Sequence, residues 1–313
     1  MSPDIAGPAG SAGPARPAGP ADPARLLDLA VAAAGAAGRM LTTGRPPGRL
    51  EVVGTKSSPT DVVTEMDRAS ERLIIDQIRA VRPGDSFLGE ESGAVGPGVA
   101  AAPAAAPADA PIDAPAGAPV RWIIDPVDGT VNYLYGLPDW AVSIAAEQAG
   151  QIVAGVVYVP QRGELFTATR GGGAWLKRDC GDGAADPLRC ASDVALTQAL
   201  VATGFGYEVA RRAVQGEVVA TVLTRVRDIR RGGSCAVDLC SLAAGRIDAY
   251  YERGINYWDR AAGGLIAEEA GATVAGLRGK GPSQELTIAA GPDLFLELHD
   301  LLVTLDPERD ASP

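Results

Sequence analysis

The hydrophobic positions of the chain follow two different rhythms. In the first half, apolar residues spaced three and four apart predict a helix over 65–81, which Pro83 and Gly84 end, and the alanine-rich segment 25–43 predicts another helix. A short apolar run predicts a strand at 120–124 that leads into Asp125. Further runs separated by turn residues predict an antiparallel meander at 140–147, 151–159 and 164–169.

The second half of the chain alternates between the two patterns. Strand patterns occur at 196–203, 226–230, 248–252, 272–276 and 286–290. Helical patterns occur between and after them, at 210–224, 234–244, 258–270 and 292–304. A meander followed by alternating strands and helices predicts an α/β fold of layered sheets, with helices between and around them.

Two segments lack this patterning because they consist largely of Ala, Gly and Pro. Residues 1–24 cannot bury enough apolar surface to offset the entropy of ordering, which predicts a disordered tail. Residues 93–119 share this composition and predict a flexible insertion, since most connections in compact domains are far shorter. The remainder, 25–306, is predicted to be a single domain of two lobes, about 25–195 and 196–306.

The charge balance argues against two classes of partner. The chain has 39 acidic and 28 basic residues and a formal net charge of −11. Nucleic acids and anionic membrane surfaces attract basic proteins, so neither is expected as a partner. A small anionic substrate is compatible with this charge if divalent cations lie between it and the carboxylates.

Histidine and cysteine usage narrows the chemistry further. His299 is the only histidine, which excludes multi-histidine zinc sites and leaves little room for Ser-His-Asp or Cys-His catalysis. The four cysteines form no CxxC pair, as expected for free thiols in a reducing cytoplasm. No apolar run approaches the roughly 18 to 20 residues of a membrane span, and no secretory signal is recognisable, so a cytoplasmic location is expected.

Four segments that carry carboxylates are the strongest candidates for chemistry. In the first, WIIDPVDGT at 122–130, a strand ends in Asp125 and a proline turn leads to a second carboxylate, Asp128. Two carboxylates and the carbonyl between them can converge on a hard cation, which takes oxygen ligands. The other three segments are GEES at 89–92, WDRAAG at 258–263 and KSSPTDVVTEMD at 56–67.

Each segment by itself has an ordinary structural explanation. An acidic turn would account for DPVDG, and a solvated surface pair would account for Glu90 and Glu91. A helix N-cap would account for Asp259, and another helix start for Asp61 or Thr64. The presence of all four segments in this order is hard to attribute to turns and caps alone.

Together the four segments resemble the signature motifs of the inositol monophosphatase family, and GGSCAVDLCSLAAGRIDAYYE at 232–252 resembles the substrate-side segment of that family. The resemblance covers about 25–305, without the insertion. It implies a layered α-β-α-β-α sandwich of the sugar-phosphatase type. It also implies a magnesium-dependent phosphoric monoester hydrolase, commonly a homodimer, that acts on a small phosphorylated substrate.

The resemblance implies a metal-binding role for one group of residues. Glu90, Asp125 and the Val127 carbonyl would bind a first magnesium ion, and Asp125, Asp128 and Asp259 would bind a second. Such a pair can activate a water molecule and neutralise the leaving oxygen in an in-line displacement.

Further roles follow from the same resemblance. Thr130, backed by Asp67, would orient the attacking water and help to deprotonate it, with Glu90 also in the catalytic set, and no covalent phosphoenzyme is expected. Lys56 and Asp61 would shape a third, weaker metal site on a loop.

The substrate would lie between two other groups. Backbone N–H groups of Gly129 and Thr130 would hold its phosphate. Its hydroxyl groups would face Gly233, Ser234, Cys235, Glu252 and Asp259.

Two positions depart from the family pattern. Val131 stands where a second Thr is common, and Arg231 stands where a smaller residue is frequent. Arg231 could bring positive charge near the substrate, or it could point to solvent.

The residues leave several substrates open. Glu252 in its YYERG context resembles the inositol-type enzymes of the family, which implies myo-inositol-1-phosphate as the substrate. The alternatives are histidinol phosphate, 3′-phosphoadenosine 5′-phosphate and fructose-1,6-bisphosphate. A hypothesis from a different class is a non-catalytic regulator that keeps the fold and binds a partner such as transcription machinery.

Overall fold

In the computed structural model, the described residues are 22–45, 54–55, 62–97, 119–178 and 183–309. Their helices and strands stack into five layers. The predicted tail and most of the predicted insertion lie outside these residues. Two of their boundaries need correction, because helix α1 (Pro23–Gly44) already begins at Pro23 and strand β4 (Gly93–Val95) occupies the start of the predicted insertion.

The larger sheet has eight strands in the order β10-β9-β8-β7-β6-β5-β3-β4. Its neighbours pair antiparallel except for β3 and β5, which run parallel. Besides β4, its strands are β3 (Ser86–Gly89), β5 (Arg121–Asp128), β6 (Ala141–Gln148), β7 (Gln151–Val159), β8 (Glu164–Thr169), β9 (Ala174–Arg178) and β10 (Asp186–Pro187). The meander predicted from the sequence is therefore confirmed as β6 to β8, and the separate strand predicted at 120–124 as part of β5.

The smaller sheet has five strands in the order β12-β11-β13-β15-β14. Here β11 pairs parallel with both β12 and β13, whereas β15 pairs antiparallel with β13 and β14. Its strands are β11 (Leu200–Thr203), β12 (Asp228–Arg230), β13 (Ala249–Glu252), β14 (Thr273–Ala275) and β15 (Thr287–Ala290). A separate two-stranded ribbon joins β1 (Gly54–Thr55) to β2 (Val62–Val63).

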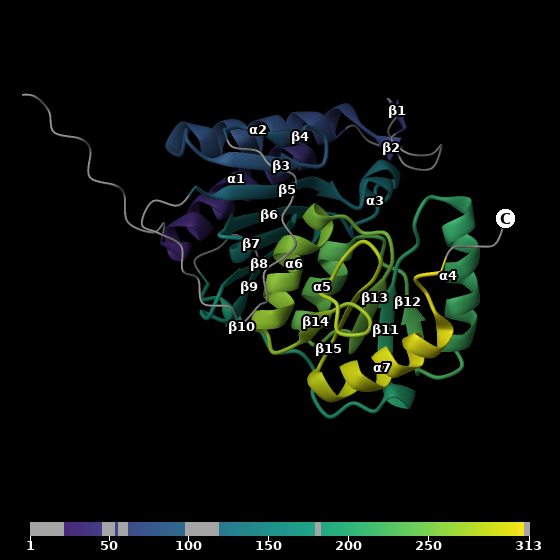
Figure 1. The fold of residues 1–313 in the computed structure, drawn as a ribbon. Helices are drawn as coiled ribbons and strands as arrows, with labels where there is room; N and C mark the ends of the chain where they lie inside the picture. Colours follow the sequence, from purple (N-terminus) through teal and green to yellow (C-terminus); the bar gives the residue numbers. More distant parts are fainter. Residues whose placement is uncertain (1–21, 46–53, 56–61, 98–118, 179–182, 310–313) are drawn as a thin grey trace, which may run out of the picture.

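The helices form the other three layers (Figure 1). Helices α1 and α2 (Glu65–Val81) cover the outer face of the larger sheet. Helices α5 (Cys235–Ala243) and α6 (Tyr257–Glu269) lie between the two sheets, and α4 (Val209–Val222) and α7 (Pro292–Leu305) cover the outer face of the smaller one. The predicted α-β-α-β-α sandwich is thus confirmed, with a short extra helix, α3 (Thr130–Tyr135), at the end of β5.

Burial on both faces explains why β5 is a nearly continuous apolar run. Its side chains alternate, so Trp122 and Ile124 pack in the core under α1 and α2, while Ile123 packs in the core under α5 and α6. A strand covered on both faces needs no polar alternation until its chain reaches the cavity at its carboxyl end. This strand therefore delivers Asp125 and Asp128 from the centre of the molecule.

Helix α1 requires a correction to the sequence analysis. By length and composition it could cross a membrane, contrary to the expectation that no such segment exists. Its small residues Ala30, Ala33, Ala34 and Ala37 are instead buried in the core against the larger sheet. The apolar character of α1 is therefore accounted for by helix-to-sheet packing within the fold.

One predicted strand is shorter than expected. Residues 196–203 were predicted to form a strand, but Leu196–Gln198 form a 3₁₀ turn and the strand begins at Leu200. The turn closes through a hydrogen bond from the Ala199 N–H to the Leu196 carbonyl, 3.1 Å.

The packing of α1 generates a stability prediction. A Cβ atom added at Gly38 would lie 2.4 Å from the Tyr158 ring of β7, whereas one added at Gly35 would meet only the flexible end of Arg39, at 3.3 Å. We expect Gly38→Ala to destabilise the fold by about 1–3 kcal/mol through overpacking. Gly35→Ala should stabilise it by about 0.5–1 kcal/mol through helix propensity. Urea unfolding of both variants tests this, and equal midpoints would contradict close packing of α1 on β7.

Candidate active site

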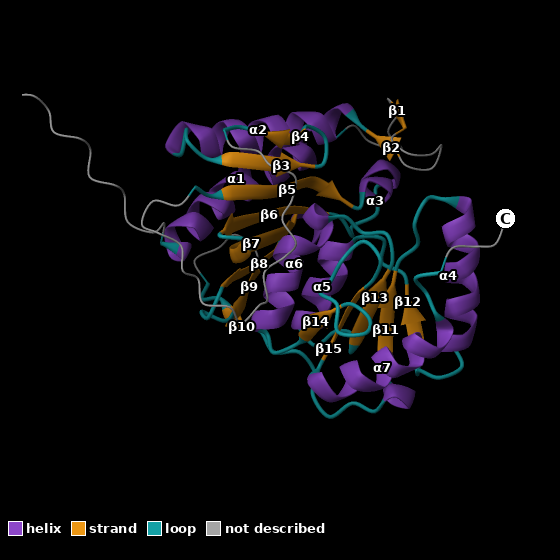
Figure 2. Ribbon diagram, in the orientation of Figure 1, coloured by secondary structure: helices purple, strands orange, loops and turns teal. Residues whose placement is uncertain are grey.

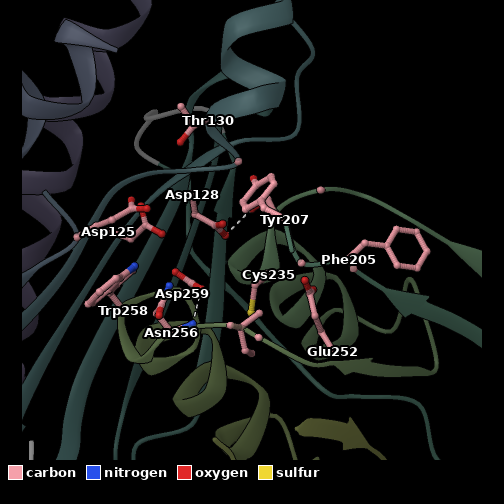
Figure 3. Close-up of a pocket in the computed structure, with 18 of the residues that line it drawn as sticks. Asp125, Asp128, Thr130, Phe205, Tyr207, Cys235, Glu252, Asn256, Trp258 and Asp259 are labelled. Carbon is pink, nitrogen blue, oxygen red and sulfur yellow. Dashed lines mark hydrogen bonds between the residues drawn. The ribbon is translucent and has the colours of Figure 1, made fainter. Parts of the chain in front are cut away.

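The carboxyl end of β5 opens into a cavity of about 470 Å³ (Figure 3). Most of the residues predicted for the site line this one cavity, although they come from five separate segments of the chain. They are Glu90, Asp125, Val127, Asp128, Gly129, Thr130, Gly233, Ser234, Cys235, Glu252 and Asp259. Lys56 and Asp61, predicted for a third metal site, lie outside the described residues.

A β-bulge brings Asp125 and Asp128 to the same cavity. Residues three apart on a regular strand point to opposite faces. Here Asp125 pairs with Ser143 and Asp128 with Ala141, so β5 has one more residue than β6 across this interval. The Pro126 carbonyl accepts a hydrogen bond from Ser70 Oγ of α2, 3.2 Å. The bulge at DPVD therefore turns the Asp128 carboxylate towards the same cavity as Asp125.

Gly129 allows the chain to turn from β5 into α3. Its φ of +92° is readily adopted only by glycine, and a Cβ there would lie 3.0 Å from the Asp139 carbonyl and 3.3 Å from the Gly233 carbonyl. Asn132 of α3 adds a bridge, because its Nδ2 donates to the Gly232 carbonyl at 2.9 Å. These close approaches bring the turn after β5 against the loop before α5.

Thr130 and Asp67 are in direct contact, as the resemblance implied. Thr130 Oγ1 donates to Asp67 Oδ1 at 3.2 Å or to the Val127 carbonyl at 3.1 Å. Asp67 is fully buried and is also the third residue of α2, where its Oδ2 accepts the Thr64 N–H at 3.0 Å. Thr64 is the N-cap of α2, so the helix-start explanation is also correct for this segment.

Glu90 is positioned by a residue that the sequence analysis missed. Glu71 is buried on α2, and its carboxylate accepts the N–H groups of Glu91 and Ser92 at 2.9 and 2.8 Å. These bonds fix the turn after β3 in which Glu90 lies. Glu71 stands three and four residues before the buried Ile74 and Ile75, so a carboxylate within the apolar stripe of α2 was the available signal.

Asp128 and Asp259 are each tied to the start of a helix. Asp128 Oδ2 accepts from Ser234 Oγ and from the Ala236 N–H, both at 2.6 Å, at the N-terminus of α5. Asp259 Oδ2 accepts the Asn256 N–H at 2.6 Å, which makes Asp259 the third residue of α6 and Asn256 its N-cap. The N-cap of α6 is therefore Asn256, three residues before Asp259, and not Asp259 itself. Asp259 also lines the cavity.

The clustered carboxylates shift one another's ionisation. Burial raises the pKa of Asp125 well above its usual value, and the charges of Glu90, Asp128 and Asp259 raise it further. Burial also raises the pKa of Asp128 to about 7, against the opposing hydrogen bonds from Ser234 and Ala236. A bound cation would relieve this repulsion.

The donor set fits hard divalent cations. Glu90, Asp125, Asp128, Asp259 and the Val127 carbonyl offer only oxygen atoms to the cavity, which is the chemistry that magnesium prefers. Among the described residues, no three acidic, thiol or imidazole side chains already close around a single point. Several of these oxygens are instead held by N–H donors at helix starts.

The outer wall of the cavity contains residues that the motifs did not indicate. Phe205 and Tyr207 come from the segment between β11 and α4 (Figure 3). Arg211 comes from the first turn of α4, and Gln284 from the loop before β15. The side chain of Arg231 is exposed and also lines the cavity.

Glu252 faces the cavity from the end of β13. Burial raises its pKa to about 7, while Tyr250 Oη, which donates to Glu252 Oε2 at 2.9 Å, and the charge of Arg231 act in the opposite direction. A Cβ at Gly204 would collide with this carboxyl group, so Glu252 lies directly over the Gly204 backbone.

The raised pKa of Asp128 predicts a pH-dependent stability of the metal-free protein. Its pKa is 3.8 ordinarily and about 7 in the fold, so between these values the folded state keeps a proton that the unfolded chain releases. Stability without metal should therefore fall as the pH rises from about 4 to about 7. Asp128→Asn should exceed the wild type in stability above pH 7, by on the order of 1 kcal/mol, and match it near pH 4.

Urea unfolding in EDTA across this range measures the effect. Asp76→Asn, an exposed carboxylate on α2, is the matched control and should leave the pH profile unchanged. Parallel profiles for Asp128→Asn and the wild type would contradict a raised pKa at this residue.

Comparisons with known proteins find similar sequences and structures over most of this chain. An inositol-1-monophosphatase of Mycobacterium leprae is 47% identical over 244 residues, covering 77% of this chain and 78% of that protein. The Nus factor SuhB of Escherichia coli is 37% identical over 256 residues, covering 81% and 86%. The solved structure of Mycobacterium tuberculosis SuhB superposes with a TM-score of 0.72 at 38% identity, covering 93% of this chain and all of that one.

The family model for the inositol monophosphatase family matches residues 22–304, nearly all of the described fold. The cavity and the carboxylate segments fall inside the matched range. The chain therefore belongs to the inositol monophosphatase family of phosphatases.

Proposed function

We propose that the protein hydrolyses myo-inositol-1-phosphate to inositol and phosphate, with magnesium ions bound at the carboxylate cavity. The observation that carries this proposal is the convergence of Glu90, Asp125, Asp128 and Asp259 in one cavity, next to the Thr130–Asp67 pair. The relatives named inositol-1-monophosphatase support the substrate.

The proposed metal ligands divide into two overlapping sets. Glu90, Asp125 and the Val127 carbonyl would hold one ion, and Asp125 would share a second ion with Asp128 and Asp259. When bound, such ions lower the pKa of water and offset the negative charge on the phosphate oxygens. Lys56 and Asp61 are proposed for a third ion.

The chain's own contribution to proton transfer centres on Thr130. Its Oγ1 can accept a hydrogen bond from the attacking water while it donates to Asp67 Oδ1, 3.2 Å away. Asp67 Oδ2 is held by the Thr64 N–H, which fixes the carboxylate for this role. The attacking water is thereby oriented and its proton directed towards Asp67, with no covalent intermediate.

The substrate's two ends would be held by different segments. Backbone N–H groups of Gly129 and Thr130 would bind the phosphate, because the φ of Gly129 opens the turn after β5 to close approach. Glu252, with Gly233, Ser234, Cys235 and Asp259, would bind the hydroxyl groups of the inositol ring. Histidinol phosphate, 3′-phosphoadenosine 5′-phosphate and fructose-1,6-bisphosphate are the alternative substrates within the same mechanism.

We also propose that the protein is cytoplasmic and a homodimer, and that residues 25–306 fold as one domain of two lobes. The free thiols support the first statement, because Cys235 and Cys240 are buried and unpaired by disulfides. The resemblance to the family supports the second.

A second candidate function is a regulatory role in transcription. Relatives of 34–37% identity are named Nus factor SuhB, including the Escherichia coli protein. Catalysis remains the first proposal for this chain, because each proposed carboxylate ligand of the two principal metal sites is present and lines the cavity.

Phosphate release from a panel of the four named substrates, with magnesium and with EDTA, tests the first proposal. We expect turnover that requires magnesium and is fastest on inositol-1-phosphate. Asp125→Asn should lower the rate of phosphate release by at least about a thousandfold, which would exclude a contaminating phosphatase as its source. The variant should retain the wild-type circular dichroism spectrum, which would show that it is folded. A preference for another substrate would change the substrate and keep the mechanism, whereas magnesium binding without turnover of any substrate would favour the regulatory function.

The Thr130–Asp67 contact predicts a specific kinetic effect. Thr130→Val keeps the shape of the side chain and removes Oγ1, so kcat should fall about a hundredfold or more while KM changes little. Thr130→Ser retains the hydroxyl and should keep most of the activity. If Thr130→Val had nearly the wild-type kcat, Thr130 would not be part of the proton path.

A further inference from the structure

A second cavity, of about 360 Å³, lies against a different face of α6. The helix contributes Tyr257, Arg260, Gly264 and Glu268 among others, which are spaced three and four apart and therefore share one face. The rest of the wall comes from the β6–β7 turn with the start of β7, Arg170, Val274 of β14 and the loop 279–282. The two cavities have no lining residue in common.

The charges around this second cavity are unusual for a chain of net charge −11. Three cationic side chains line it, Arg170, Arg260 and Lys280, against one carboxylate, Glu268. Arg170 pairs with Glu268 at 3.1 Å, and Lys280 Nζ lies 3.3 Å from Glu308. The lining therefore has an excess of positive charge that acidic groups of the cavity wall do not neutralise.

Of the three cationic side chains that line the second cavity, Arg260 is the one without a carboxylate partner among the described residues. Within the part of the chain that the structure describes, it forms no hydrogen bond or ion pair, and its Nε is buried without an acceptor. A guanidinium group carries five N–H donors, and leaving them unpaired in a partly desolvated position is costly. An anion in the cavity that pairs with the terminal N–H groups of Arg260 would offset part of this cost.

The guanidinium group is held ready for such a partner. It stacks on the Tyr257 ring, with 5.0 Å between Cζ and the ring centroid. The ring is itself fixed, because Tyr257 Oη donates to Glu147 Oε2 at 2.8 Å and Arg121 pairs with Glu147 at 2.7 Å. The aromatic face therefore restricts Arg260 before any ligand binds, which lowers the entropy lost on binding. Gly264 leaves the helix surface open here, since a Cβ there would meet nothing within 4 Å.

We propose that this cavity binds a small metabolite with more than one acidic group, phosphate or carboxylate, and that Arg260 is its principal donor. Arg170 and Lys280 complete the positive field. The volume is that of a small-molecule site and exceeds what a single ion needs. This site is independent of the proposed hydrolysis, because it needs no magnesium and shares no residue with the active-site cavity.

Isothermal titration calorimetry in EDTA, at constant ionic strength, tests the proposal with inorganic phosphate and citrate as probes. Without metal, the carboxylates of the active-site cavity repel anions, so binding reports on the second cavity. We expect the wild type to bind at least one probe, and Arg260→Gln to bind it about tenfold more weakly. Binding of phosphate alone or of citrate alone would identify the acidic group that the site prefers.

Matched variants control for charge and for folding. Arg72→Gln, an exposed arginine on α2, should bind as the wild type does, and Arg260→Lys should retain part of the affinity. Lys280→Gln, on an exposed loop, should weaken binding about threefold and tests the site even if Arg260→Gln fails to fold. The proposal would be overturned if the wild type bound neither probe. It would also be overturned if Arg260→Gln and Lys280→Gln both bound the probe as tightly as the wild type does. A change of particle mass in Arg260→Gln without any anion binding by the wild type would overturn it as well, and would show that Arg260 pairs with a second copy of the chain.

Discussion

The constraint on which the site depends is the repulsion between carboxylates that the fold buries together. Asp125 is held beside Glu90, Asp128 and Asp259, and both its burial and its neighbours oppose ionisation. Such a cluster is unfavourable unless something fixes the groups in place and something else neutralises them. The fold does the first through N–H and O–H donors, as with Ser234 and Ala236 on Asp128. Divalent cations would do the second, and this division explains why an acidic protein can act on an acidic substrate.

The layered architecture brings these groups to one point from distant parts of the chain. β5 is central to the larger sheet, and its bulge turns two carboxylates into the same cavity. α5 and α6 lie between the sheets, so that their N-termini meet the end of β5 (Figure 2). Their dipoles add positive potential where the negative charge is concentrated. The site residues therefore lie at the ends of helices and strands from different layers.

Much of this arrangement could be predicted from the sequence, for reasons that are local. The apolar run before Asp125, the stripe of α2 and the alternation after residue 196 each depend on neighbours within one element. The signature segments supplied the carboxylates and, through the family resemblance, their grouping. The bulge at Asp125 and Asp128 was not predicted, because a strand's register is set by its partner β6 and not by its own residues.

Other residues escaped prediction for a related reason. Glu71 acts on Glu91 and Ser92 across twenty positions of sequence, and Phe205 and Arg211 reach the cavity only after both sheets have assembled. The strand β9 was missed because it is short and follows a run of glycines. The membrane-like composition of α1 was missed because small residues that suit close packing on a sheet also raise hydropathy.

The aspartates that bond to the N-cap residues of α2 and α6, Asp67 and Asp259, have a consequence for how this family can change over evolutionary time. Asp67 and Asp259 each accept the N–H of a helix N-cap residue through Oδ2. Asp67 also accepts from Thr130 through Oδ1, and Asp259 lines the cavity. A descendant that gave up turnover for a binding role would still lose helix stability on replacing either residue. Selection for folding alone would therefore preserve both aspartates in an inactive lineage. The presence of both aspartates in a relative is therefore weak evidence that the relative is catalytic. Thr130, which caps no helix, is a more informative position at which to compare relatives.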